Sequence, residues 1–151
     1  MSRGSRSRGY RAERELVAQL WRRGFAVMRA PASGSKVKRA HYPDVVAIKN
    51  GRVAVFEVKS RSKEGNIYIE EEQIAKLVEF AARAGGKAFV AVKLPRQDWA
   101  FVPVERLELT SSGYRIRRDI LSDSLNLDQL EVLLGLRSTL LEYVKTSEEI
   151  K

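Results

Sequence analysis

Three charged residues lie close together in and around an apolar stretch, residues 43–61, which reads PDVVAIKNGRVAVFEVKSR. Glu57 and Lys59 belong to a run typical of a buried β-strand, and Asp44 precedes Glu57 by 13 residues. A buried charge is costly unless it is paired. Two converging carboxylates would repel each other, and a divalent cation such as Mg²⁺ would remove that repulsion. With a lysine beside them, these residues could support metal-assisted hydrolysis of a phosphodiester.

The secondary structure expected around these residues would bring them together. Alternate side chains of a strand share a face, so Glu57 and Lys59 should point the same way. The Asn50-Gly51 pair is a strong hairpin signal, and a hairpin there would return Asp44 to the end of the sheet where Glu57 emerges. The alternative interpretation of these residues is structural, with Glu57 and Lys59 as an exposed ion pair and Asp44 as an ordinary turn residue.

Glu13 could add a third carboxylate from a different segment. It falls in line with Leu16, Val17 and Leu20, the apolar stripe of a helix expected over residues 11–25. A carboxylate at the N-terminal end of a core-facing stripe could face the end of the sheet. Alternatively, Glu13 is a first-turn glutamate that the helix dipole favours. Pattern alone leaves both interpretations open.

The remaining elements alternate between strands and helices, which predicts one α/β domain with a central mixed β-sheet flanked by helices. We expect a flexible basic arm at residues 1–10, a single domain at 11–145 and a C-terminal tail at 146–151. Gly85-Gly86 should end the second helix, and Gly135 could break the last one. The expected strands are 26–31, 44–49, 52–60, 87–94 and 99–104, with a turn and short exposed strand at 111–119; the helices are 11–25, 69–84 and 127–145.

The charge distribution favours nucleic acid as a partner. The chain carries a formal charge of +9, and residues 1–40 alone hold 11 basic residues against two glutamates. Such segments suit contacts with phosphates, although a solubilising tail is the alternative. The absence of cysteine and the single histidine exclude cysteine-based zinc sites and multi-histidine sites. No apolar run approaches the roughly 20 residues of a membrane span, so we expect a cytoplasmic, DNA-associated protein.

Several longer stretches make the motif more specific. "PD" followed by "EVK" resembles the P-D…(D/E)-x-K signature of restriction-endonuclease-like nucleases. RAERELVAQLWRRGFAVMRAPASGS, YPDVVAIKNG, FEVKSR, EEEQIAKLVEFAARAGGKAFVAVK and LEVLLGL together resemble the archaeal Holliday junction resolvases of the Hjc type. The resemblance spans roughly residues 11–140, and the segments occur in the family's order.

The resemblance implies a restriction-endonuclease-like fold and a homodimer that cuts two opposing strands of a four-way DNA junction. It also implies Mg²⁺ as cofactor, with Mn²⁺ able to substitute. The dimer interface could lie around Phe80, or around Leu130, Leu133 and Leu134. The residues that it implies as catalytic are Glu13, Asp44, Glu57, Lys59 and Ser33, and the first three of these would hold the metal. Expected DNA contacts are Arg14, Arg29, Ser35 and Gln73 from the resemblance, and Lys36, Lys38 and Arg39 from the basic loop.

Other functions remain open at this point. A related nuclease could act on ordinary or damaged duplex DNA, and a basic DNA-binding protein could carry a degenerate site. An intact set of Asp44, Glu57 and Lys59 argues against the second alternative. Gln73 could also be a solvent-facing residue of a first helical turn. Replication or recombination proteins are possible further partners.

Overall fold

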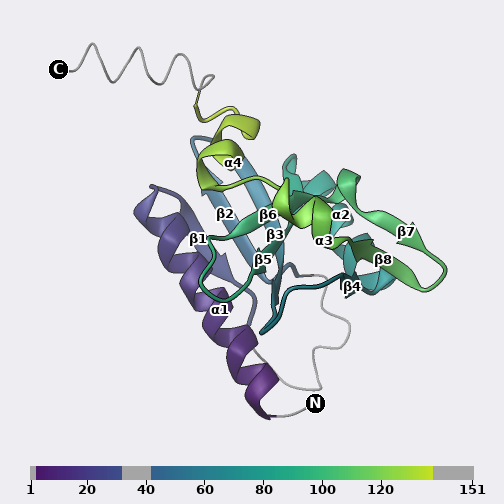
Figure 1. Ribbon diagram of the computed structural model, residues 1–151. Coiled ribbons are helices and arrows are strands. Elements are labelled where there is room, and N and C mark those ends of the chain that lie inside the picture. Colours follow the sequence, from purple (N-terminus) through teal and green to yellow (C-terminus); the bar gives the residue numbers. More distant parts are fainter. Residues whose placement is uncertain (1–2, 32–41, 138–151) are drawn as a thin grey trace.

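The computed structural model describes residues 3–31 and 42–137. Figure 1 shows the order of helices and strands along the chain. The elements are α1 (Arg3–Arg22), β1 (Ala26–Arg29), β2 (Val45–Lys49), β3 (Arg52–Ser60), β4 (Ile67–Ile69), α2 (Glu71–Ala84), β5 (Lys87–Lys93), β6 (Ala100–Pro103), the 3₁₀ helix η2 (Val104–Arg106), β7 (Glu108–Thr110), β8 (Gly113–Ile116), α3 (Arg118–Ser122) and α4 (Leu127–Leu133).

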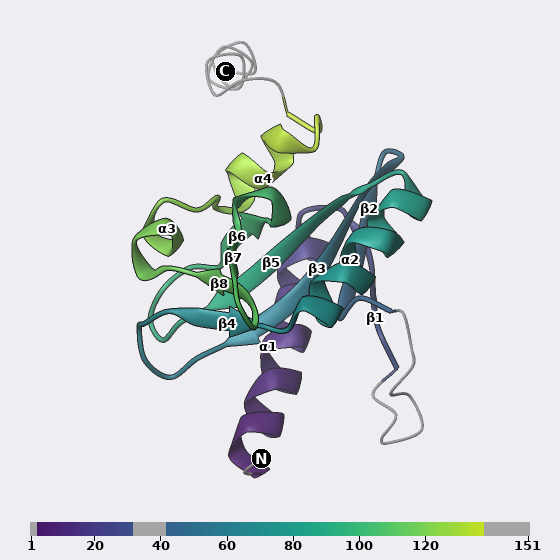
Figure 2. The ribbon, with the colours of Figure 1, turned by 90° about the vertical axis from the view of Figure 1, so that its right-hand side faces the viewer.

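A five-stranded mixed sheet in the order β1-β2-β3-β5-β6 forms the centre of the molecule. Only β3 and β5 run parallel to each other; the other neighbouring pairs are antiparallel. The helices α1 and α2 cover opposite faces of this sheet (Figure 2). On one face Leu16 and Leu20 of α1 pack with Phe56, and on the other Leu77 of α2 packs with Val55. The expected α/β architecture is therefore confirmed.

The β2–β3 hairpin forms where the sequence predicts it. Asn50 and Gly51 both have positive φ, 51° and 75°, the pattern of a type I′ turn that matches the twist of the flanking strands. The register pairs Lys49 with Arg52 and continues to Val45 with Phe56. This register places the residue before Val45, which is Asp44, beside the residue after Phe56, which is Glu57.

A second, three-stranded sheet in the order β4-β8-β7 was not predicted. Its middle strand, β8, lies within the strand expected at 111–119, but that strand was expected to be exposed and its residues Gly113 and Ile116 are buried. These strands have only three or four residues, and their apolar side chains pack against Val90 and Val102 of the main sheet. Gly113 is required here, because a Cβ at this position would lie 2.6 Å from the carbonyl oxygen of Ile69.

The N-terminal end of the described chain differs from expectation, whereas the C-terminal end agrees with it. The helix α1 begins at Arg3, so residues 3–10 continue the helix where a flexible arm was expected. Extending a helix that is already packed needs no new nucleus, which explains how this glycine- and serine-containing segment can be helical. At the other end α4 stops at Leu133, and Gly135 has φ of 76°, which confirms the expected break. The rest of the expected C-terminal helix, 138–145, lies outside the described residues.

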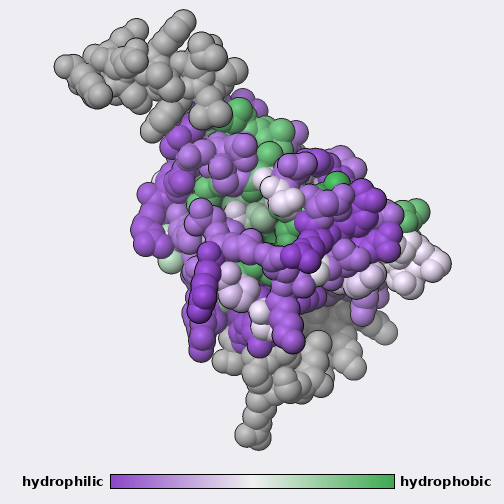
Figure 3. Space-filling view, viewed as in Figure 1, coloured by the Kyte–Doolittle hydropathy of each residue, from purple (hydrophilic) through white to green (hydrophobic). Residues whose placement is uncertain are grey.

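Across the part of the chain that the structure describes, no helix is long and apolar enough to span a membrane. The face seen in Figure 3 is mainly hydrophilic, with hydrophobic surface around α4 and at the outer end of the small sheet near β7.

Candidate active site

Asp44 and Glu57 meet at the end of the main sheet where β2 begins and β3 finishes. The backbone N–H of Val58 donates to Oδ2 of Asp44 at 2.8 Å, which fixes the orientation of this carboxylate. The register places Asp44 beside Glu57, and the two carboxyl groups interact closely enough to shift each other's pKa. The register of the hairpin therefore brings the two carboxylates together, as the spacing of the motif suggests.

Burial makes it unfavourable for both carboxylates to be ionised together. It raises the pKa of Glu57 to about 8, with the negative charge of Asp44 adding to the effect and Lys59 opposing it. Burial also raises the pKa of Asp44, against the opposing effects of the Val58 N–H and Lys59. A divalent cation would remove this penalty, because it would neutralise both groups at once. The donor set of two adjacent, buried carboxylates thus fits a hard cation that prefers oxygen ligands.

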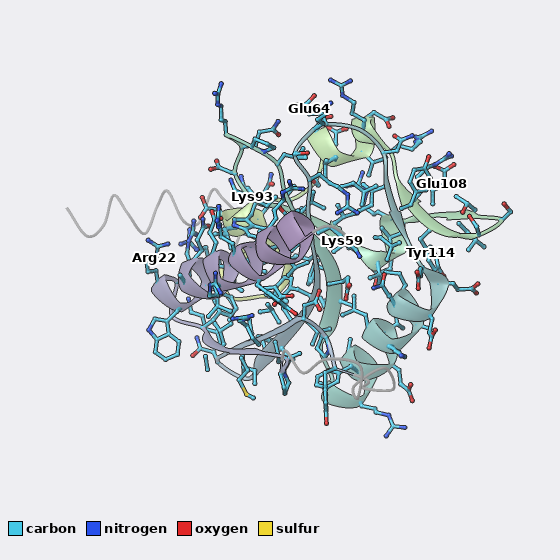
Figure 4. The ribbon with its side chains drawn as sticks, turned by 90° about the horizontal axis from the view of Figure 1, so that it is seen from below. Arg22, Lys59, Glu64, Lys93, Glu108 and Tyr114 are labelled. Atoms are coloured by element: carbon cyan, nitrogen blue, oxygen red, sulfur yellow. The ribbon has the colours of Figure 1, made fainter. Side chains whose placement is uncertain are left out.

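Lys59 lies on the same face of β3 as Glu57 and is held from two sides. Its Nζ is 3.6 Å from Oε1 of Glu57 and donates to Oε1 of Gln73, in the first turn of α2, at 3.4 Å. Its side chain is only 16% exposed. Figure 4 views the molecule from this end of the sheet and labels Lys59. The ammonium group is thus positioned beside the carboxylate pair by residues of two different elements.

Glu13 lies near this pair but does not join it. Its Oε2 accepts a hydrogen bond from Arg29 at 3.2 Å, across from α1 to the end of β1. Burial raises the pKa of Glu13, and the charge of Asp44 raises it further, so the two carboxylates are electrostatically coupled. Among residues 3–31 and 42–137, no group of three or more histidine, cysteine or acidic side chains is arranged to hold a metal ion. The structure therefore brings Asp44 and Glu57 together and pairs Glu13 with Arg29, and a role for Glu13 at the metal stays a prediction.

The expected DNA contacts have different environments. Arg14 is exposed on α1, as a phosphate contact requires. Arg29 is half-buried against Glu13, and its Nε is buried without a hydrogen-bond partner. The Arg29–Glu13 ion pair was not predicted, since no local pattern links a strand end to a helix 16 residues earlier. Gln73 faces Lys59 instead of solvent. The residues Ser33, Ser35, Lys36, Lys38 and Arg39 lie outside the described residues.

Comparison with known proteins identifies a group of related chains. The family model described as archaeal Holliday junction resolvase (Hjc) matches residues 4–138. Over 127 residues the chain is 43% identical to the crossover junction endodeoxyribonuclease Hjc of Sulfurisphaera tokodaii and 38% identical to that of Sulfolobus acidocaldarius. Each alignment covers 83% of this chain and 87% of the relative. The solved structure of Archaeoglobus fulgidus Hjc, a Holliday junction resolvase, matches with a TM-score of 0.74 and 36% identity, covering 82% of this chain and 98% of the other.

Proposed function

The chain belongs to the archaeal Holliday junction resolvase (Hjc) family, and from that premise we propose that it resolves four-way DNA junctions by Mg²⁺-dependent hydrolysis of phosphodiester bonds. The contact between Asp44 and Glu57, with Lys59 beside them, carries this proposal. This arrangement supports an active site at the end of the main sheet. The overall fold of the chain matches that of a solved resolvase. An enzyme of this kind acts on chromosomal DNA, so we also propose a cytoplasmic, DNA-associated location.

Asp44 and Glu57 are the residues that would hold the metal ion. When bound, Mg²⁺ supplies a Lewis acid that polarises a phosphoryl oxygen and activates water, and Mn²⁺ would serve in the same way. Oδ2 of Asp44 accepts a hydrogen bond from the Val58 N–H, so the other carboxylate oxygen would be available to the ion. Glu13 contributes through its charge and through water, because Arg29 occupies one of its carboxylate oxygens.

Lys59 supplies positive charge where negative charge develops on the phosphate. An ammonium group has three N–H donors. Two of these N–H groups can point towards Glu57 and Gln73, so the third remains for a phosphoryl oxygen or the attacking water. Because the amine is held before the substrate arrives, little reorganisation is needed during the reaction. We propose that Gln73 positions Lys59 and that Lys59 itself contacts the reacting phosphate.

DNA is held by basic residues that contact the backbone and do not read bases. Arg14 on α1 would supply such contacts, together with Lys36, Lys38 and Arg39, which lie between β1 and β2 in the sequence. Phosphate contacts fix register and orientation, which suits recognition of a DNA shape. Arg29 supports the site through Glu13 and has an unpartnered buried Nε that a phosphate oxygen could satisfy.

We propose that two copies of the chain pair through the α2 side of the main sheet, so that each cuts one of two opposing strands. Met28 and Ile48 are 71% and 42% exposed on neighbouring strands of this face, beside the apolar cluster into which Phe80 of α2 packs. The alternative interface around α4 is less suitable, because Leu130 and Leu134 are buried in the core of one subunit. Two-fold symmetry would place the two active sites in equivalent positions on a pseudo-symmetric junction.

The proposal is tested by incubating the protein with a labelled four-way junction and with linear duplex, in Mg²⁺ or in EDTA. We expect paired cuts in the junction, little cutting of duplex and none in EDTA. Equal cutting of both DNAs would favour a general nuclease. Tight junction binding without any cutting would favour a non-catalytic DNA-binding protein. Glu105→Gln, which removes an exposed carboxylate on η2 far along the chain from the site, is the matched control for substitutions at Asp44 and Glu57.

A further inference from the structure

A cavity of about 630 Å³ lies between α3, the loop after β5 and the segment before β4. Its floor is aliphatic and includes Val92, Leu94 and Ala100. Its rim is polar and includes Asn66 and Gln97. None of the residues that we assign to hydrolysis lines this cavity, so its role is separate from bond cleavage.

The cavity begins next to the active site. Lys59 on β3 and Val92 on β5 are register partners in adjacent parallel strands, which are about 4.8 Å apart. Register partners point to the same face of a sheet, so Val92 lies on the side of the sheet that carries the Lys59 amine. Ala100 continues the floor on the next strand, opposite Val92. Figure 4 shows both Lys59 and the rim residue Glu64 from this end of the molecule.

The charges around the cavity favour a neutral ligand. Three carboxylates, those of Glu64, Asp98 and Asp119, line it together with two guanidinium groups, those of Arg117 and Arg118. Both guanidinium groups are already engaged, Arg118 with Glu64 and Arg117 with Asp119. A phosphate would therefore meet net negative charge. The rim amides are partly engaged, because Gln97 Nε2 donates to Glu64 and Asn66 Oδ1 accepts from the Arg118 backbone N–H. The side-chain oxygen of Gln97 and the Asn66 NH₂ group, above an aliphatic floor, suit a flat heterocycle that has hydrogen-bonding edges.

We propose that this cavity takes a nucleobase displaced from its pair at the branch point of the junction, a role that rests on the proposed function and adds a source of its specificity. A nucleotide bound at Lys59 would have a neighbouring base within reach of the Val92 floor. In an open junction the base pairs at the branch point stack on one side only, so their bases cost less to displace than bases inside a duplex. The cavity would therefore favour binding of a junction over binding of a linear duplex.

The first test uses junctions that carry 2-aminopurine at one branch-point position each, bound to the unmodified protein in EDTA. Unstacking raises the fluorescence of 2-aminopurine, and an aliphatic floor offers no ring on which the base could stack again. We expect at least one branch-point position to brighten on binding, while the same probe in the middle of an arm does not. No brightening at any branch-point position, despite saturated binding, would overturn the proposal.

The second test fills the cavity. Ala100→Leu adds side-chain volume to the floor, Ala100→Ser does not, and Ala75→Leu adds the same volume on the exposed side of α2. We expect Ala100→Leu alone to abolish the brightening and to lower the ratio of junction to duplex cleavage by about tenfold, the effect of one modest interaction. An unchanged ratio and unchanged fluorescence in a folded Ala100→Leu protein would contradict the proposal.

The two proposals fail in different ways. If the unmodified protein does not cut junctions in Mg²⁺, the proposed function is wrong. If it cuts junctions with the usual preference but no base brightens, only the cavity proposal is wrong. The fluorescence test also remains decisive should Ala100→Leu fail to fold, because it needs no variant.

Discussion

The backbone N–H of Val58 donates to the carboxylate of Asp44 at 2.8 Å, so the β2–β3 hairpin itself holds the carboxylate against Glu57. This bond links the backbone of β3 to the first residue of the motif. It keeps together two carboxyl groups that would repel each other if both were ionised. The fold therefore positions the Asp44 carboxylate before metal or DNA binds.

Asp44→Asn separates charge from geometry at this position. The amide oxygen of asparagine can still accept the Val58 N–H, so the fold should be kept, while the negative charge is lost. We expect junction cleavage to fall by at least about 100-fold with junction affinity nearly unchanged, because one carboxylate alone holds Mg²⁺ poorly. Single-turnover cleavage and gel-shift titration measure the two quantities. A variant that cuts normally at the same Mg²⁺ concentration would exclude Asp44 as a metal ligand.

Lys59→Ala should lose cleavage and keep junction affinity, since binding resides mainly in the basic segments. Gln73→Ala should cause a smaller loss of the same kind, because it frees the Lys59 amine without removing it. We expect a rate loss of about 100-fold for the first, the lower end of the range that mutagenesis finds for groups that stabilise charge, and a smaller loss of about tenfold for the second. Measured affinities that fall in step with the rates would contradict this division. If Gln73 were only a structural residue, its substitution would lower stability and leave the cleavage rate of the folded protein unchanged.

The pKa of Glu57, about 8 in the folded protein against 4.5 as its ordinary value, predicts how stability depends on pH without metal. Between these values the folded state holds a proton that the unfolded chain has released, so the free energy of unfolding falls as pH rises from about 5 to 8. Each unit of difference is worth about 1.4 kcal/mol at most. Urea unfolding in EDTA at several pH values measures this slope, and Glu57→Gln should flatten it. Equal slopes in the two proteins would show that Glu57 is ionised throughout.

The N-terminal residues test the role of the basic charge. Removing residues 1–9 deletes three arginines, and each phosphate contact contributes about 0.9 to the slope of log affinity against log salt. We expect the slope to decrease by up to about 3 units, with the cleavage rate of bound junction little changed. Removal of residues 146–151, which deletes only one basic residue, is the control and should leave the slope unchanged. The same slope in both truncated proteins would mean that the N-terminal segment acts only as a solubilising tail.

The parts of the structure that the sequence predicted depend on local signals. The Asn50-Gly51 turn, the alternation around Glu57 and the apolar run of β5 each specify an element and its orientation without reference to distant residues. The small sheet could not be found in this way, because strands as short as β4 and β7 are stable only through packing on the main sheet. The same limit applies to Glu13. Its helix position was predicted, but its partner Arg29 is a consequence of how α1 packs against β1.

The proposed pairing through the α2 side of the sheet predicts that Phe80→Glu dissociates the dimer, because a carboxylate there would be buried against an apolar surface in the pair. The matched control is Leu133→Glu on α4, which is 43% exposed and belongs to the alternative interface. Sedimentation measures the oligomeric state, and a supercoiled plasmid with an extruded cruciform reports how the cuts are made. Two cuts within one binding event give linear plasmid, whereas single cuts give nicked circles. We expect Phe80→Glu to sediment as a monomer and to shift the product towards nicked circles, while Leu133→Glu retains the dimer and linear product. The reverse pattern would place the interface on α4.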